Sequence, residues 1–404
     1  MSAKESTSPR PDRQLSFLHA SNVAHYGHVI AAASRHFDPV SLVTRFEVTP
    51  NQVSSLRRLG IPRRFVDLVK RRMVDDRIGL SGRRHSFGLS QFLLPAIART
   101  PWSHGPRDIR FVTSQYARRV ARISPRADVF HFIEGLGYRS LRQTDFALSI
   151  CERRNFHHAV YESPLEPNLD FPENAVPDPI GAILEEEYSR ADRILVYSEV
   201  ARESFLSRGF DPLKVSVAPI GLGSQLPQTA RRRDPHLFLY VGRGNIFKGI
   251  DVAVAAITSL GQPYRLVVAG PASAEVQRWL RQFPNVAYRG ILGREALREL
   301  YSTASALLSP SVESFGLAAW EGIGHGLRLI ASDTMGATEY IPAHLRTVLV
   351  GRDVQAWCEA VLANDSSIDD ETRRRDGLAA VNAMSWERAS SALDSIYTDP
   401  QIGQ

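Results

Sequence analysis

The chain has 404 residues, which is long enough for two domains of ordinary size. Its 43% hydrophobic and 23% charged residues are typical of a globular protein, and no apolar run approaches the ~18 residues of a membrane-spanning helix. Cys151 and Cys358 match no metal or redox spacing, so we expect reduced thiols in a cytoplasmic protein. The net charge of +6 favours an anionic partner: a nucleic acid, a membrane surface or a phosphorylated substrate.

The first half of the chain alternates between apolar runs and helical patterns. The polar residues 1–14 are predicted to be a disordered leader. A strand, a loop that contains Gly27 and a helix then follow, as at the start of an α/β domain. Further strands are predicted over 128–133, 145–150, 159–162, 191–198 and 215–221. The segment 163–178 is rich in Pro and Asp, which predicts a surface loop.

The segment 51–85 mixes pairs of basic residues with apolar ones. Such a pattern is typical of an amphipathic helix that lies on anionic lipid. It is also, and more commonly, the pattern of a solvated helical segment whose apolar side packs on its own domain. Both interpretations stay open, and the first would give the protein a peripheral contact with an anionic membrane.

The polar segment 223–235, with three consecutive arginines, marks the predicted domain boundary. After it, strands and helices alternate regularly, which predicts a parallel sheet with right-handed crossovers. We therefore predict domains over 15–222 and 223–384, followed by a final helix over 385–398.

The stretch Ser309–Glu321 holds two carboxylates, Glu313 and Glu321, that are separated by seven residues. An apolar strand precedes it, and a helix is predicted to begin near Ser314 to Gly316 with Ser314 as its cap. Because a helix N-terminus presents free N–H groups and partial positive charge, it is suited to a phosphate. The pattern predicts an anion site flanked by two carboxylates.

A second loop, from Gly242 to Gly249, follows a predicted strand and carries the cations Arg243 and Lys248. Its glycine spacing fits neither a P-loop nor the dinucleotide fingerprint. Cations placed in advance would stabilise the charge that a departing nucleoside diphosphate gains. The sequence shows no clustered His, Asp and Glu ligand set, so no metal is predicted.

From Pro310 to Gly326 the chain resembles the retaining glycosyltransferases of the GT-B fold, of the family 4 type, and so does the loop 242–249. The resemblance implies two Rossmann-like α/β domains that face each other across a cleft. It implies that Arg243 and Lys248 neutralise the donor's diphosphate. It implies that Glu313 faces the transferred sugar, and that Glu321 binds the ribose hydroxyls. The other expected donor contacts are Gly242, Gly27, Arg289, Ile291, Ser314, Phe315, Gly316 and Leu317.

The first half matches the family in strand order alone. In family members a His or an acidic residue often ends a strand near the anomeric carbon, and His131 is predicted to take this place. Glu134 competes for the role, and a half-buried structural histidine is the alternative for His131. The family implies that the last helix crosses back onto the first domain. Where many members have two glycines after the first strand, this chain has Gly27.

The expected function is transfer of a sugar from a nucleoside-diphosphate sugar to a glycan, lipid-linked or small-molecule acceptor, without a metal or other cofactor. A sugar-nucleotide epimerase or hydrolase on the same fold is one alternative. A non-catalytic sugar-nucleotide-binding protein is another. Nucleic-acid binding is not expected, because no recognition motif accompanies the basic charge. The expected location is the cytoplasm, at the inner membrane face if 51–85 binds lipid.

Overall fold

The computed structural model describes residues 15–21, 26–44, 54–55, 57–58, 60, 80–86, 106–173, 178–223, 232–364 and 369–398. The leader predicted over 1–14 and most of the basic segment 51–85 lie outside these residues. The interpretation of 51–85 as a lipid-binding helix therefore stays a prediction. Within the described residues, no helix is both long and apolar enough to cross a membrane.

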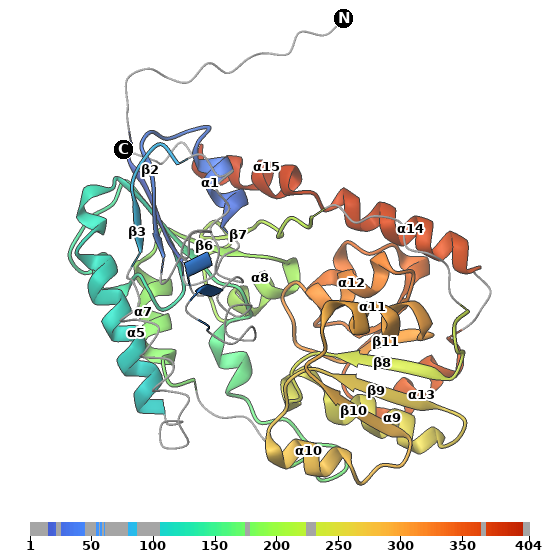
Figure 1. Cartoon of the computed structure of the whole chain (residues 1–404). Helices are drawn as coiled ribbons and strands as arrows, with labels where there is room; N and C mark the ends of the chain where they lie inside the picture. The colour runs from blue at the N-terminus through green and yellow to red at the C-terminus, as the bar shows by residue number, and fades with distance from the viewer. Residues whose placement is uncertain are drawn as a thin grey trace, which may run out of the picture.

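The first half of the chain forms a sheet of seven parallel strands in the order β3-β2-β1-β4-β5-β6-β7 (Figure 1). Its strands are β1 Phe17–Ser21, β2 Val40–Thr44, β3 Arg84–Ser86, β4 Val129–Ile133, β5 Leu148–Glu152, β6 Arg193–Val196 and β7 Val215–Val217. Its helices are α1 Gly27–Ala33, α5 Pro106–Ala121, α6 Tyr138–Leu141, α7 Gly181–Arg190 and α8 Glu199–Leu206. The central strands β1, β4 and β5 are buried along their whole length, because helices cover both faces.

The second half forms a sheet of six parallel strands in the order β10-β9-β8-β11-β12-β13. Its strands are β8 Leu237–Val241, β9 Arg265–Ala269, β10 Val286–Gly290, β11 Ala306–Ser309, β12 Arg328–Ser332 and β13 Arg346–Leu349. Its helices are α9 Ile250–Leu260, α10 Ala274–Leu280, α11 Arg294–Thr303, α12 Leu317–Gly324 and α13 Val354–Leu362. One core packs α9 and α13 on the sheet, and another packs α11 and α12 on the opposite face.

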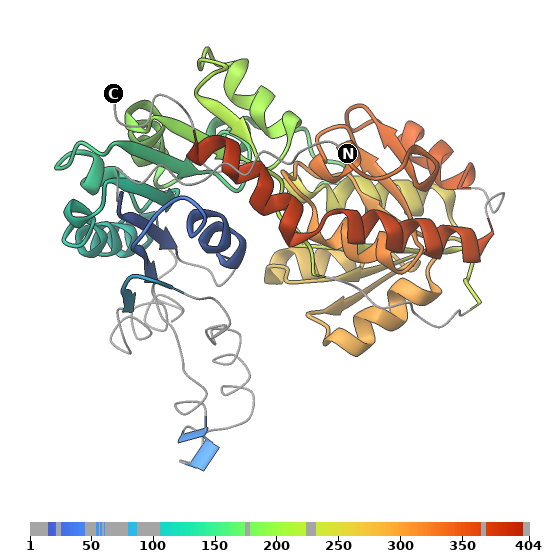
Figure 2. The same ribbon diagram turned by 90° about the horizontal axis from the view of Figure 1, so that it is seen from above.

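The last two helices, α14 Asp370–Ala383 and α15 Trp386–Tyr397, run from the second sheet to the first (Figure 2). Val381 of α14 belongs to a core of the second half. Leu393, Ile396 and Tyr397 of α15 instead join the core that α1 forms on the first sheet. Ser385 caps α15 by accepting a hydrogen bond from the amide of Arg388. Helix α15 is thus part of the first sheet's core.

One prediction for the segment that follows β5 was wrong. Residues 159–162 were predicted as a strand, but His158–Tyr161 is a 3-10 turn, which His157 caps through its ring. The segment 163–178 was predicted as a surface loop, and its described residues are irregular and mostly exposed, although Phe171 is buried in the core of the second sheet and Leu165 packs against that core. Its backbone is also held there, because the Trp279 indole donates to the carbonyl of Leu169 at 2.8 Å. Its Pro and Asp content signals irregular backbone, which does not exclude burial of single apolar side chains.

Candidate active site

The two loops that the sequence singled out in the second half meet in space. The side chains of Lys248 and Glu313 form an ion pair, and Nζ also lies 3.4 Å from the carbonyl oxygen of Val312. The amide of Val312 donates to the carbonyl of Phe247 at 2.8 Å, which joins the two loops through their backbones. Strands β8 and β11 are neighbours, so the loops at their carboxyl ends must lie side by side.

Local backbone geometry fixes the position of Lys248. It ends the short turn Ile246–Lys248, and the Asn245 side chain caps this turn by accepting from the Lys248 amide at 2.9 Å. Gly249 follows with φ +66°, and a Cβ there would lie 1.9 Å from the carbonyl oxygen of Pro310. Only glycine allows the two loops to approach this closely. The close approach of the two loops therefore explains why a glycine, Gly249, directly follows Lys248 in the sequence.

Helix α12 begins at Leu317, after Gly316 in the left-handed conformation with φ +78°. The prediction that Ser314 caps this helix was wrong. The Ser314 hydroxyl instead donates to the carbonyl oxygen of Arg154, in the first half of the chain. The N-terminus of α12 has no side-chain cap in the described structure, so its first N–H groups have no capping side chain as a partner there.

Glu321 is the fifth residue of α12, somewhat more than one turn from the N-terminus rather than two. Its carboxylate is exposed and accepts a hydrogen bond from the Tyr301 hydroxyl at 3.0 Å. This contact leaves the second oxygen available to a ligand. Phe315, before the helix, is buried at 2% exposure, whereas Leu317, its first residue, is half exposed.

The remaining predicted donor contacts lie along the same edge of the second sheet. Gly242 follows β8, and its amide donates to the carbonyl of Ala269 at the end of β9. Arg243 is exposed and forms no ion pair with any described residue. Arg289 lies in β10 and is exposed, and Ile291 just after it is 74% exposed. These residues come from the ends of β8 and β10, which β9 separates, so one elongated ligand could span them.

Contacts from the first half reach this edge from the opposite side. The amides of Glu199 and Val200, at the N-terminus of α8, donate to the Glu339 carboxylate at 2.9 and 2.8 Å. Gly336 lies between Ser314 and Ser198, one from each half of the chain. In addition, the rings of Tyr197 and Phe315 meet edge to face at 6.4 Å. Sequence reasoning missed all of these interface contacts, because each joins residues more than a hundred positions apart.

The first half presents a charged group next to this interface. Glu134 follows β4 and lies 3.5 Å from Arg154 and 3.9 Å from Arg153. The turn after Glu134 is held by Glu187, whose buried carboxylate accepts from the amides of Gly135, Gly137 and Tyr138 at 2.6 to 2.9 Å. A signal for this anchor was visible, since Glu187 is the last of three consecutive glutamates on a predicted helix.

The structure does not bring His131 to the ion pair of Lys248 and Glu313. It is completely buried within β4, where its Nδ1 lies 2.9 Å from the Tyr397 hydroxyl of α15. Burial lowers the pKa of His131, which keeps its ring neutral. The prediction overlooked that strand alternation places His131 on the face that α1 and α15 cover. Gly27, which opens α1, follows residues that the structure does not describe.

The structure does bring together groups that could bind a metal, although the sequence suggested no ligand set. One group is His19, His131 and Glu152, and all three are buried. The other is His157, His158 and Glu185, where Glu185 is exposed. Neither was found from the sequence because each set is assembled from separate elements.

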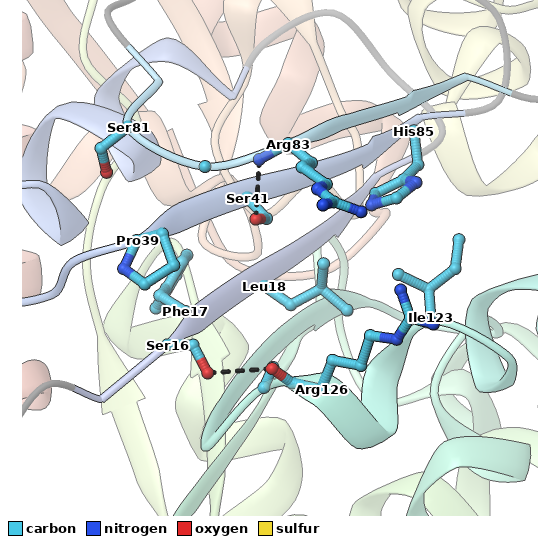
Figure 3. A pocket seen from close by; sticks show the side chains of 12 residues that line it. Ser16, Phe17, Leu18, Pro39, Ser41, Ser81, Arg83, His85, Ile123 and Arg126 are labelled. Carbon is cyan, nitrogen blue, oxygen red and sulfur yellow. Dashed lines mark hydrogen bonds between the residues drawn. The ribbon is translucent and has the colours of Figure 1, made fainter.

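A cavity of about 440 Å³ lies at the opposite, amino-terminal edge of the first sheet (Figure 3). Its lining includes Ser16, Pro39, Arg83, His85 and Arg126. Because parallel α/β sheets bind ligands at the carboxyl ends of their strands, this cavity is not the candidate active site.

Comparisons with known proteins show what this chain is similar to in sequence and fold. Residues 235–364, about a third of the chain, match the sequence profile of the family described as glycosyl transferases group 1. The D-inositol 3-phosphate glycosyltransferase of Xylanimonas cellulosilytica is 30% identical over 257 residues, which are 55% of this chain and 61% of that protein. A GDP-mannose-dependent alpha-(1-6)-phosphatidylinositol dimannoside mannosyltransferase of Mycobacterium tuberculosis is 30% identical over 164 residues, 39% of this chain and 42% of that one.

The chain thus spans about three-fifths or less of these relatives' lengths. Among solved structures, the sucrose-phosphate synthase of Thermosynechococcus elongatus aligns with a TM-score of 0.58 over 95% of this chain and 98% of its own. Its sequence is 18% identical, so this likeness concerns the fold alone. The match over residues 235–364 is therefore to the glycosyl transferases group 1 family, and the two parallel α/β sheets have the GT-B fold of the solved structures.

Proposed function

We propose that this protein is a retaining glycosyltransferase that moves a hexose from a nucleoside-diphosphate sugar to an acceptor. The observation that carries the proposal is the contact between Lys248 and Glu313 beside the uncapped N-terminus of α12. A cation, free amides and carboxylates at one sheet edge are the groups that a sugar nucleotide needs. One relative named above is GDP-mannose-dependent, which supports this donor class.

In this proposal the donor lies along the second domain, over 223–384. Lys248, Arg243 and the first amides of α12 hold the diphosphate and stabilise the charge that it gains as the glycosidic bond breaks. The exposed oxygen of Glu321 accepts hydrogen bonds from the ribose hydroxyls. Arg289 and Ile291 frame the base, and Gly242 lets the donor approach the backbone closely.

The acceptor side is the first domain, over 15–222. Because His131 is fully buried, we assign it no contact with the sugar. Glu134, one residue beyond β4, takes this place in the proposal, and Arg153 and Arg154 hold its carboxylate. Gly27 opens α1 at the carboxyl end of β1, where its backbone can approach the ligand.

Glu313 has two successive partners in this scheme. Without a donor it neutralises Lys248, and with a donor bound the diphosphate takes over Lys248 while Glu313 turns to the sugar hydroxyls. We expect Glu313→Gln to bind a nucleoside diphosphate at least as tightly as the wild type, because Lys248 is freed from its partner. Sugar transfer should nevertheless fall about 100-fold, since an oriented hydrogen-bond acceptor is lost.

Calorimetric titration with UDP and GDP and a turnover assay would separate these two effects of Glu313→Gln. Weaker binding of both nucleotides to the variant would contradict the assigned role. Glu275→Gln is the matched control, because Glu275 lies on the exposed face of α10 and bonds to Arg278 alone of the described cations.

The proposal as a whole is tested by a thermal-shift screen of the wild type against a panel of UDP-, GDP-, ADP- and dTDP-sugars. A ligand at 100 times its Kd stabilises the folded state by about 2.7 kcal/mol, which such a screen detects. We expect a clear shift with one nucleotide class and none with free sugars. No shift with any member of the panel would refute the proposed donor site.

A further inference from the structure

Three buried side chains from three neighbouring strands converge beneath α15. They are His19 of β1, His131 of β4 and Glu152 of β5. The register pairs His19 directly with His131, and it pairs Ile150 with His131 on the other side. Glu152 lies two positions beyond Ile150, so strand alternation places all three side chains on one face of the sheet. Their exposures are 1%, 0% and 3%.

The atoms that face one another in this cluster lack hydrogen bonds to described residues. His19 Nε2 and His131 Nε2 lie 3.5 and 3.3 Å from the same oxygen, Oε2 of Glu152. These distances are those of ion pairs if the histidine rings are protonated, but none of the three atoms has hydrogen-bond geometry toward a described partner. Leaving a buried polar atom without a partner costs about 1–3 kcal/mol, so three together call for an explanation.

A divalent ion explains these distances. With metal–ligand bonds of about 2.0–2.1 Å, the ligands of a tetrahedral zinc ion lie about 3.3–3.5 Å apart. The two distances to Glu152 Oε2 have this length. The possible ligand atoms of the two histidines lie within 4.8 Å of each other.

His131 and Glu152 each have a second polar atom, directed away from the cluster, that contacts a tyrosine hydroxyl, as ligands in protein metal sites often do. His131 Nδ1 lies 2.9 Å from the Tyr397 hydroxyl, and Oε1 of Glu152 accepts a hydrogen bond from the Tyr197 hydroxyl. Such outer contacts orient metal-binding rings and carboxylates. Both tyrosines are buried, and they come from α15 and from the end of β6.

The second histidine cluster differs in this respect. Both ring nitrogens of His158 are hydrogen-bonded to carboxylates, to Glu162 at 2.9 Å and to Glu185 at 2.6 Å. His157 Nδ1 accepts from the amide of Ala159. Hydrogen bonds therefore account for most of this cluster, and it needs no ion.

We propose that His19, His131 and Glu152 bind one zinc ion, with a water molecule in the fourth position. The ion joins strands β1, β4 and β5. Through Tyr397 it also fastens α15 to the first sheet. Through Tyr197, whose ring contacts Phe315, it supports the turn before α12. Because the cluster is buried, the ion stabilises the fold and takes no part in sugar transfer.

The test is the metal content of the full chain, purified without chelators from zinc-supplemented culture. Mass spectrometry of metals should find about one zinc ion per chain. Glu152→Gln keeps the size of the side chain and should lose most of the zinc. His158→Gln, in the cluster that needs no ion, should keep it. Substitution by cobalt should give the visible absorption of a tetrahedral site in the wild type and in His158→Gln.

If Glu152→Gln does not fold, measurements on the wild type alone test whether zinc is bound. Removal of zinc by a chelator should lower Tm, and added zinc should restore it. A wild-type protein that contains almost no zinc, and whose Tm does not respond to added zinc, would overturn the proposal. Neither measurement uses a sugar nucleotide, so the proposed zinc site and the proposed donor site can be refuted independently of each other.

Discussion

Replacing Lys248 by alanine is expected to lower sugar transfer by about 100- to 1,000-fold, the usual effect of losing one preorganised charge partner. The lysine ammonium is the cation placed closest to Glu313, at the junction of the two loops. Without it the departing diphosphate lacks compensation for its growing charge. Turnover of the matching sugar nucleotide, measured as diphosphate release, checks the prediction.

The fold of the Lys248→Ala variant should persist. The side chains of Lys248 and Glu313 are 26% and 27% exposed, so water solvates the carboxylate that loses its partner. The cap from Asn245 uses the backbone amide of residue 248 and is unaffected. Arg278→Ala is the matched control, since this cation is 69% exposed on α10 and should leave turnover as it is. If Lys248→Ala turns over the sugar nucleotide at the wild-type rate, Lys248 does not belong to the donor site.

Replacing Gly336 by alanine should also abolish most activity, for a steric reason. A Cβ at this position would lie 2.0 Å from the carbonyl oxygen of Ser314 and 2.6 Å from the Ser198 hydroxyl. The methyl group must push the two domains apart or shift the turn that carries Glu313. Because a misplacement of about 1 Å can cost about 100-fold in rate, transfer should fall by roughly that factor.

Two measurements check the steric explanation for Gly336→Ala. Its Tm should fall, because overpacking typically costs about 1–3 kcal/mol. Small-angle scattering should show a larger radius of gyration if the domains separate. Gly223→Ala is the control, since the nearest atom to a Cβ there is 4.0 Å away. Activity in Gly336→Ala equal to that in Gly223→Ala would show that this interface does not position the donor turn.

The second domain could be predicted well because its elements are local patterns. The regular alternation of strands and helices expected after residue 235 is observed, from β8 Leu237–Val241 to α13 Val354–Leu362. The meeting of the Lys248 and Glu313 loops followed from the parallel order of strands. In the first domain, β2, β3 and α5 were not predicted, because they lie in or beside a long basic segment with weak periodicity.

Side-chain partners across the fold could not be predicted in the same way. Ser314 looked like a helix cap, but its partner Arg154 is 160 positions away. His131 looked like a residue of the cleft, yet the tyrosine of the last helix covers it. The cluster of His19, His131 and Glu152 depends on the register of three strands, which no local pattern specifies.

The central claim is that this chain breaks a nucleoside-diphosphate sugar at the anomeric carbon with retention. Proton NMR of the wild type with the nucleotide sugar that gives the largest thermal shift tests this most directly. No acceptor is needed, because slow transfer to water is sufficient. We predict release of the nucleoside diphosphate, with the first sugar product in the same anomeric configuration as the donor. An intact donor after prolonged incubation, or a first product of inverted configuration, would contradict the account.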